Sequence, residues 1–171
     1  MRVRLVTFSS RWSRLRSLYA RSPHTVAVHV DMPQSHKTTR RVEFRDTDAA
    51  GMVHFSVFFV YMEQAEHELL RHLGLSVMLA DEHGAISFPR VATRCDYQRA
   101  VKFEDMLDVE VAIVRLGKKS VTYEVDFSHE GRPVASGQTT VVCCRFQNDG
   151  TPKSITIPAW IAEKLAVACV E

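Results

Sequence analysis

The pattern of apolar and polar residues predicts one long helix in the first half of the chain. Apolar side chains recur every three or four residues, which is the period of one face of an α-helix. Gly74 follows the last of them, at a place where glycine readily adopts the left-handed conformation that ends helices. The repeat therefore predicts a helix ending near Leu73 to Gly74, with its buried face formed by Phe55, Phe58, Met62, Ala65, Leu69 and Leu73.

Shorter stretches of alternating or continuous apolar residues predict strands on both sides of this helix. Gly117 with Lys118 and Lys119 predicts one hairpin turn, and Glu130-Gly131 predicts a second. We expect 76–84 to be a loop and 157–170, opening at Pro158, to be a shorter helix. The predicted strands are 37–45, 86–100 (bent or started near Pro89), 106–116, 121–127 and 134–146.

This order of elements indicates an α+β fold. Two segments have one apolar face, built by Leu107, Val109, Val111 and Ile113 and by Val121, Tyr123, Val125 and Phe127. An antiparallel sheet with one apolar face needs a cover, and one long amphipathic helix is available. The sequence thus predicts an antiparallel sheet of about five strands wrapped around one long helix.

Composition and charge narrow the class of protein. The chain has 171 residues, 46% hydrophobic and 25% charged, which suits one globular domain. Residues 1–31 hold six arginines and one acid, whereas the remaining 140 hold 16 basic and 19 acidic side chains. The mildly acidic body argues against a nucleic-acid partner. No apolar run approaches the roughly 20 residues of a membrane span, so stable membrane insertion is not expected.

The first 35 residues differ from the rest in being rich in Arg and Ser and free of acids before Asp31. That composition is typical of an organelle transit peptide. A disordered basic tail and a start codon assigned too early, with Met32 as the true start, are equally compatible. We assign 1–35 to an extension and 36–171 to the domain.

The four cysteines point to a reducing compartment. Cys95, Cys143, Cys144 and Cys169 show neither CxxC spacing nor a histidine cluster that would suggest zinc. Free thiols are the simpler interpretation, and they favour the cytoplasm.

Candidate chemistry lies just ahead of the long helix, where Asp46, Asp48 and Gly51 form a turn. The first N–H groups of a helix lack internal partners and attract negative charge. Asp48 is therefore either a cap that stiffens the turn or a nucleophile or base beside an oxyanion hole. Asp46 is expected to hold the turn or a neighbouring strand.

The turn Asp-Thr-Asp-Ala-Ala-Gly-Met-Val-His-Phe, with Tyr61-Met62-Glu63 in the helix, resembles the hotdog-fold acyl-CoA thioesterases. It is most similar to the group that contains 4-hydroxybenzoyl-CoA thioesterase and the short-chain acyl-CoA thioesterases associated with the Tol-Pal system. The resemblance covers roughly residues 38–168. It includes Phe88-Pro89-Arg90, Cys95-Asp96-Tyr97, the turn from Arg115 to Ser120 and Ile157-Pro158.

The resemblance implies roles for three positions of the motif. Asp48 would be the catalytic carboxylate, either attacking the thioester carbonyl or acting as general base on water. The backbone N–H of Phe55 would bind the thioester oxygen, and Gly51 would let the chain approach closely. No metal or cofactor is implied, because CoA is part of the substrate.

Further substrate contacts are expected from the helix and from one hairpin. His54 could line the pocket or cap the helix, and Glu63 matches an acidic position of the family. Phe58 and Met62, with Phe55 and Phe59, are candidates for the acyl pocket. Basic residues at the turn of Lys118 and Lys119 contact CoA phosphates in relatives, although two exposed hairpin lysines need no such role.

The resulting functional hypothesis is an acyl-CoA thioesterase that acts as a homodimer or homotetramer, since hotdog domains pair through their sheets. Two alternatives remain open. One is a 3-hydroxyacyl thioester dehydratase, and the other is a domain that binds acyl-CoA without catalysis.

Overall fold

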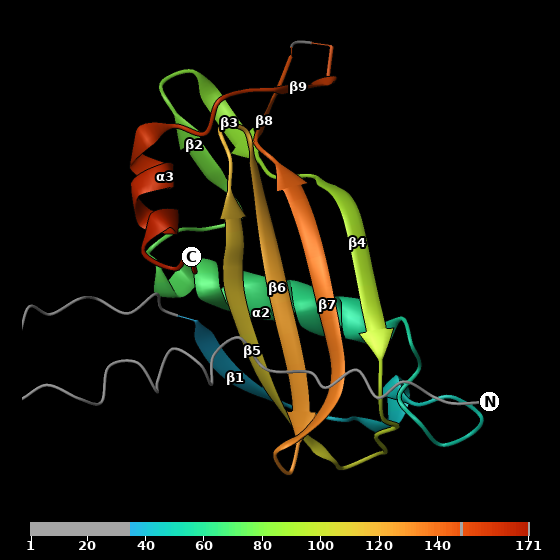
Figure 1. The fold of residues 1–171 in the computed structure, drawn as a ribbon. Coiled ribbons are helices and arrows are strands. Elements are labelled where there is room, and N and C mark those ends of the chain that lie inside the picture. Colours follow the sequence, from blue (N-terminus) through green and yellow to red (C-terminus); the bar gives the residue numbers. More distant parts are fainter. Residues whose placement is uncertain (1–34, 148, 171) are drawn as a thin grey trace, which may run out of the picture. The chain divides into compact units, whose positions relative to one another are not determined.

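The structure, a computed structural model, describes residues 35–147 and 149–170, and Figure 1 shows their fold. Five strands form an antiparallel main sheet. The predicted extension 1–35 lies outside the described residues except for Ser35, so it stays a prediction. In sheet order the strands are β1 (His36–Arg41), β5 (Met106–Leu116), β6 (Ser120–His129), β7 (Arg132–Val142) and β4 (Arg90–Tyr97).

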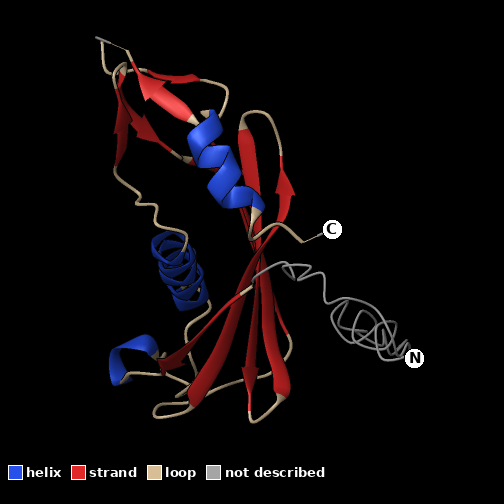
Figure 2. Cartoon of the chain, turned by 90° about the vertical axis from the view of Figure 1, so that its left-hand side faces the viewer, coloured by secondary structure: helices blue, strands red, loops and turns tan. Residues whose placement is uncertain are grey.

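The helix α2 (Val57–His72) lies against one face of this sheet, and Figure 2 views it nearly end-on with the strands passing beside it. The predicted inner faces of β5 and β6 are buried, as are Phe58, Met62, Ala65 and Leu69 of the helix. The predicted packing of one helix on an antiparallel sheet is therefore confirmed. Within the described ranges, no helix is long and apolar enough to cross a membrane.

The helix starts two residues later than the apolar repeat predicts. Phe55 lies in a turn closed by a hydrogen bond from the Val57 N–H to the His54 carbonyl oxygen at 2.9 Å. Its side chain is 59% exposed, so the expectation that Phe55 belongs to the buried face is wrong. The repeat extends into the turn because spacing alone does not show where the backbone leaves the helix.

The first strand is shorter than predicted, because β1 ends at Arg41 and does not continue to Arg45. Val42 leaves the ladder and exchanges backbone hydrogen bonds with Glu104 and Asp105. The chain then forms a short 3-10 helix, η1 (Phe44–Asp46).

A second sheet of four short strands was not predicted. The segment 86–100 is divided near Pro89, where a bend or a start was expected, and the segment 134–146 is divided at Cys143, where no break was expected. The parts before Pro89 and after Cys143 join this second sheet. The stretch 76–84, expected as a loop, also contributes a strand. The four strands, in sheet order, are β2 (Leu79–Asp81), β3 (Gly84–Ser87), β8 (Cys144–Phe146) and β9 (Pro152–Ser154).

Two hairpins and the second helix agree with the sequence. Gly117 closes the β5–β6 turn through a hydrogen bond from its N–H to the Ser120 carbonyl oxygen at 2.8 Å. Glu130 and Gly131 close the β6–β7 turn with positive φ angles of 50° and 72°, as a two-residue hairpin requires. The helix α3 (Ala159–Ala166) follows Pro158 as expected.

Candidate functional site

The loop between β1 and α2 is a small hairpin whose arms are joined by backbone hydrogen bonds. Thr47 forms an antiparallel bridge with Val53, and the His54 N–H donates to the Asp46 carbonyl oxygen at 2.8 Å. The Asp46 carboxylate fastens this hairpin to α2, because its Oδ2 accepts a hydrogen bond from the Tyr61 hydroxyl at 2.7 Å. Asp46 therefore holds the turn, as predicted, and Tyr61, a member of the motif for which no role was predicted, is a positioning residue.

Asp48 is held at the tip of this hairpin by only one of its carboxylate oxygens. Oδ1 accepts hydrogen bonds from the N–H groups of Ala50, at 2.8 Å, and Met52, at 3.3 Å. Oδ2 has no hydrogen-bond partner among residues 35–147 and 149–170. The side chain is thus both a turn-stabilising acceptor and a carboxylate with one oxygen free for chemistry.

Gly51 supports the hairpin through its backbone conformation. Its φ is 73°, a region that side chains other than glycine rarely adopt. A Cβ at this position would have nothing within 4 Å in the described chain, so close packing of this chain does not explain the glycine.

The peptide group at Phe55 lies in the turn that leads into α2. The Phe55 carbonyl oxygen accepts a hydrogen bond from the Tyr97 hydroxyl at 3.0 Å, which fixes that residue from the end of β4. In the part of the chain that the structure describes, the Phe55 N–H donates to no acceptor. A free, oriented N–H at a helix start can stabilise a developing oxyanion.

An open hollow of about 310 Å³ lies beside this peptide, lined by residues that include Phe55, Phe58 and Tyr97. His54 is not among the residues that line it. Its Nδ1 lies 2.7 Å from the Ser56 Oγ at the helix start. Met62 does not line it either and is buried against Gly137 of β7. The structure therefore brings Phe58 to the hollow and leaves the contacts predicted for His54 and Met62 as predictions.

Glu63 belongs to a charged cluster that the sequence did not predict as a unit. Its Oε1 lies 3.0 Å from Nη1 of Arg90, and Oε2 of Glu66 lies 2.8 Å from Nη2 of the same arginine. Burial raises the pKa of Glu66 to about 7, although Arg90 opposes this rise. One sequence signal for Glu66 was available: it lies on the buried face of the helix, four residues after Met62.

Lys118 and Lys119 lie at the opposite end of the main sheet from the Asp48 hairpin. The hairpin contacts the segment just before β5, since Val53 donates its N–H to the Val101 carbonyl oxygen, whereas the lysines follow the end of β5. An 11-residue strand spans roughly 35 Å. One chain therefore does not bring these lysines to its own Asp48.

No group of three or more His, Cys, Asp or Glu side chains within 35–147 and 149–170 is arranged to hold a metal ion. The carboxylates of Asp46 and Asp48 accept hydrogen bonds from Tyr61 and from the Ala50 N–H, respectively.

Comparison with known proteins identifies the family of the chain. The profile of the thioesterase-like superfamily matches residues 42–165. The chain is 31% identical over 109 residues to a 1,4-dihydroxy-2-naphthoyl-CoA hydrolase of Synechococcus elongatus, covering 63% of this chain and 80% of the relative. It is 26% identical over 118 residues to the acyl-CoA thioesterase YbgC of Haemophilus influenzae, covering 69% and 85%.

A solved structure shows the same likeness in three dimensions. The gentisyl-coenzyme A thioesterase BH1999 superposes with a TM-score of 0.65 at 28% identity, covering 76% of this chain and 99% of that protein. The profile match spans well over half of the chain, and the resemblance seen in the motif is thereby confirmed. The chain belongs to the thioesterase-like superfamily and is a thioester hydrolase with the hotdog fold.

Proposed function

We propose that the protein hydrolyses an acyl-CoA thioester to a carboxylic acid and CoA, with Asp48 as the reactive carboxylate and the Phe55 N–H as the oxyanion donor. One observation carries this proposal. The hairpin fixes its own backbone and one Asp48 oxygen, yet leaves Oδ2 of Asp48 and the N–H of Phe55 without partners among the described residues.

These two groups suit the charge changes of thioester cleavage. The carbonyl oxygen gains negative charge as the carbon becomes tetrahedral, so a fixed N–H stabilises the transition state more than the substrate. Asp48 either attacks the carbonyl carbon, giving a mixed anhydride that water then hydrolyses, or removes a proton from the attacking water. In both routes the carbon–sulfur bond breaks and CoA leaves as the thiolate.

The test is the substitution Asp48→Asn. Asparagine keeps an oxygen that accepts hydrogen bonds from Ala50 and Met52, so the hairpin is preserved while nucleophilicity and basicity are lost. We expect kcat to fall by about 10² to 10⁴. Asp149→Asn is the matched control, because Asp149 also accepts a backbone N–H, from Thr151, in a turn of the second sheet.

The assay follows released CoA with a thiol reagent over short, aromatic and long acyl-CoAs, and it also identifies the preferred acyl group. If Asp48→Asn retains hydrolysis within about threefold of the wild type on every acyl-CoA that the wild type cleaves, the assigned chemistry is wrong. A single turnover in ¹⁸O-labelled water gives a positive test of the first route. Label in the Asp48 carboxylate marks nucleophilic attack, because it arises only when water adds to the Asp48 carboxyl carbon of the anhydride.

A homodimer or homotetramer is part of the proposal. Within the described residues β4 pairs only with β7, and its other edge exposes Val91 and Tyr97. An unpaired edge of eight residues is a template for pairing with a second copy. Such a copy would have to bring Lys118 and Lys119 to the CoA phosphates, since the same chain does not. Light scattering coupled to gel filtration tests this part, and a monomer at micromolar concentration would contradict it.

We also propose a cytoplasmic location. The support is chemical: all four cysteines are free thiols, which suits a reducing compartment. A fluorescent fusion of the full chain, imaged in the cells that make it, would check this.

A further inference from the structure

A second, more enclosed cavity lies between the C-terminal half of α2, the main sheet and α3. Its volume is about 80 Å³. On the helix, the cavity lies at Glu66, which is nine residues after Val57 and therefore about 14 Å from the helix start. The cavity is therefore separate from the hollow beside Phe55, and none of its lining residues lines that hollow.

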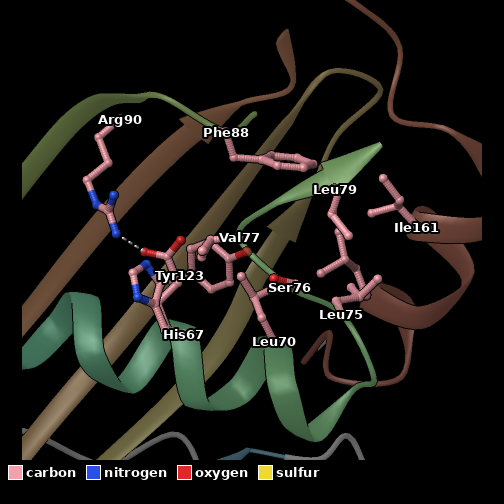
Figure 3. Close-up of a pocket in the computed structure, with 12 residues that line it drawn as sticks. His67, Leu70, Leu75, Ser76, Val77, Leu79, Phe88, Arg90, Tyr123 and Ile161 are labelled. Carbon is pink, nitrogen blue, oxygen red and sulfur yellow. Dashed lines mark hydrogen bonds and ion pairs between the residues drawn. The ribbon is translucent and has the colours of Figure 1, made fainter. Parts of the chain in front are cut away.

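The cavity has a polar end and an apolar end. Figure 3 shows Arg90 and His67 on one side and Leu79 and Ile161 on the other. Two of its polar side chains are deeply buried: Glu66 is 5% exposed and Tyr123 is 2% exposed. A molecule in this cavity would contact hydrocarbon along most of its length and polar oxygen atoms at one tip.

Those oxygen atoms lack hydrogen bonds. Oε2 of Glu66 is bonded to Arg90, but Oε1 of Glu66 and the Tyr123 hydroxyl have no partner among the described residues. Among the described residues, Ser87 Oγ is the only fully enclosed side-chain oxygen or nitrogen that has no hydrogen-bond partner. The oxygens of Glu66 and Tyr123 are therefore not sealed in the core. Both oxygens belong to residues that line the cavity, and a molecule bound there can form hydrogen bonds with them.

The charges around the cavity disfavour an ionic ligand. Arg90 is shared between Glu63 and Glu66, and burial raises the pKa of Glu66 to about 7. Burial also lowers the pKa of His67, which keeps its ring neutral. An anion would meet the Glu66 carboxyl group, and a cation would meet Arg90 beside apolar walls. An uncharged hydroxyl can instead donate to Glu66 and accept from Tyr123.

We propose that this cavity binds an uncharged hydroxyl group on a short apolar stem, with Glu66 and Tyr123 holding the hydroxyl. The size limits the stem, because a cavity of about 150 Å³ accommodates benzene and this one is about half as large. The hydroxyl and roughly the first one or two carbons of the stem therefore fill the cavity, and the rest of a longer stem extends through its open side. The hydroxyl has two sources: the far end of the acyl group, which rests on the proposed function, or a free small alcohol.

The first experiment measures binding without catalysis. The full-length protein, as wild type and as Asp48→Asn, is titrated with 1-butanol and with 1-chlorobutane, which lacks the hydroxyl. Methyl NMR signals of Leu70, Leu79 and Ile161 report occupancy. We expect saturable shifts with 1-butanol in both proteins and at least threefold weaker binding of 1-chlorobutane.

Variants then test whether Tyr123 and Glu66 bind the hydroxyl group. Tyr123→Phe removes only the cavity hydroxyl and should weaken 1-butanol binding about 3- to 10-fold. Tyr61→Phe is the matched control, since its hydroxyl bonds to Asp46 outside the cavity; equal losses in the two variants would contradict the proposal. Glu66→Gln gives a second measure, and it should lower the preference for 1-butanol over 1-chlorobutane.

The second experiment distinguishes the two sources. Acyl-CoAs of increasing length are compared with their ω-hydroxy counterparts in wild type and Tyr123→Phe. If the acyl end occupies the cavity, kcat/KM of one ω-hydroxy substrate exceeds that of its parent, and Tyr123→Phe removes the difference. If butanol binds but all pairs react equally, the ligand is a free alcohol. Absence of saturable butanol binding in both proteins overturns the proposal, whether or not Asp48→Asn abolishes hydrolysis.

Discussion

The buried carboxyl of Glu66 makes a quantitative prediction about stability and pH. Its pKa rises from an ordinary 4.5 to about 7 in the folded protein, chiefly because the group is buried. The folded state thus holds the proton more tightly than the unfolded state. The stability that this proton contributes is present below pH 4.5 and is lost as the pH rises through 7.

The full effect is about 3 kcal/mol, and most of it develops between pH 5 and pH 8. Glu66→Gln removes the titration and keeps an oxygen that can accept from Arg90. The free energy of unfolding of Glu66→Gln, relative to that of the wild type, should therefore rise by about 2 kcal/mol from pH 5 to pH 8, because only the wild type loses stability as Glu66 ionises. Urea denaturation of both proteins at pH 5 and pH 8 measures it, and other titrating groups cancel in the difference.

The matched control is Glu68→Gln, two residues along the same helix. Burial alone would raise the pKa of Glu68, but hydrogen bonds from Thr38 and Arg40 hold it below its ordinary value. Its stabilising contribution is therefore present above the unfolded pKa and is lost only as the pH falls through the lower, folded value. The loss in Glu68→Gln should change little between pH 5 and pH 8, apart from the part that depends on the charge of His36, whose Nε2 lies 3.6 Å from Oε2 of Glu68. A Glu66→Gln difference that changes by less than about 0.5 kcal/mol over this range would refute the argument from burial.

Three further predictions concern the site and the core. Tyr97→Phe releases the carbonyl at the helix start, and we expect kcat to fall about 3- to 10-fold without loss of folding, measured by hydrolysis and circular dichroism. Gly137→Ala places a Cβ about 2.6 Å from Met62 Cε, so unfolding in urea should show a loss of about 1–3 kcal/mol; unchanged stability would mean that Met62 moves aside freely. Lys118→Ala with Lys119→Ala should raise KM for acyl-CoA and leave unchanged the hydrolysis of an acyl thioester without the nucleotide, with the difference shrinking at high salt.

The helix and the hairpins were predictable because each depends on neighbours in sequence. The apolar repeat placed Phe58, Met62, Ala65 and Leu69 inside, and the Glu130-Gly131 pair marked a turn with positive φ. The second sheet was missed for the opposite reason. Its strands are only three or four residues long, and apolar runs that cross Pro89 and Cys143 gave no sign of a change of partner.

In the candidate site, too, some features depend on neighbours in sequence and others on contacts made by the tertiary structure. The sequence by itself determined the turn that holds Asp48, since Gly51 and the two acids are local features, and the motif that resembles the thioesterases includes them. Only the tertiary structure decided which oxygen of Asp48 is free, that Tyr97 holds Phe55, and that Arg90 joins two carboxylates. The residue pairs Phe55–Tyr97 and Glu66–Arg90 are 42 and 24 positions apart. Such contacts are fixed by how the helix docks on the sheet, and periodicity, which reports only the face of an element, contains no information about its partner.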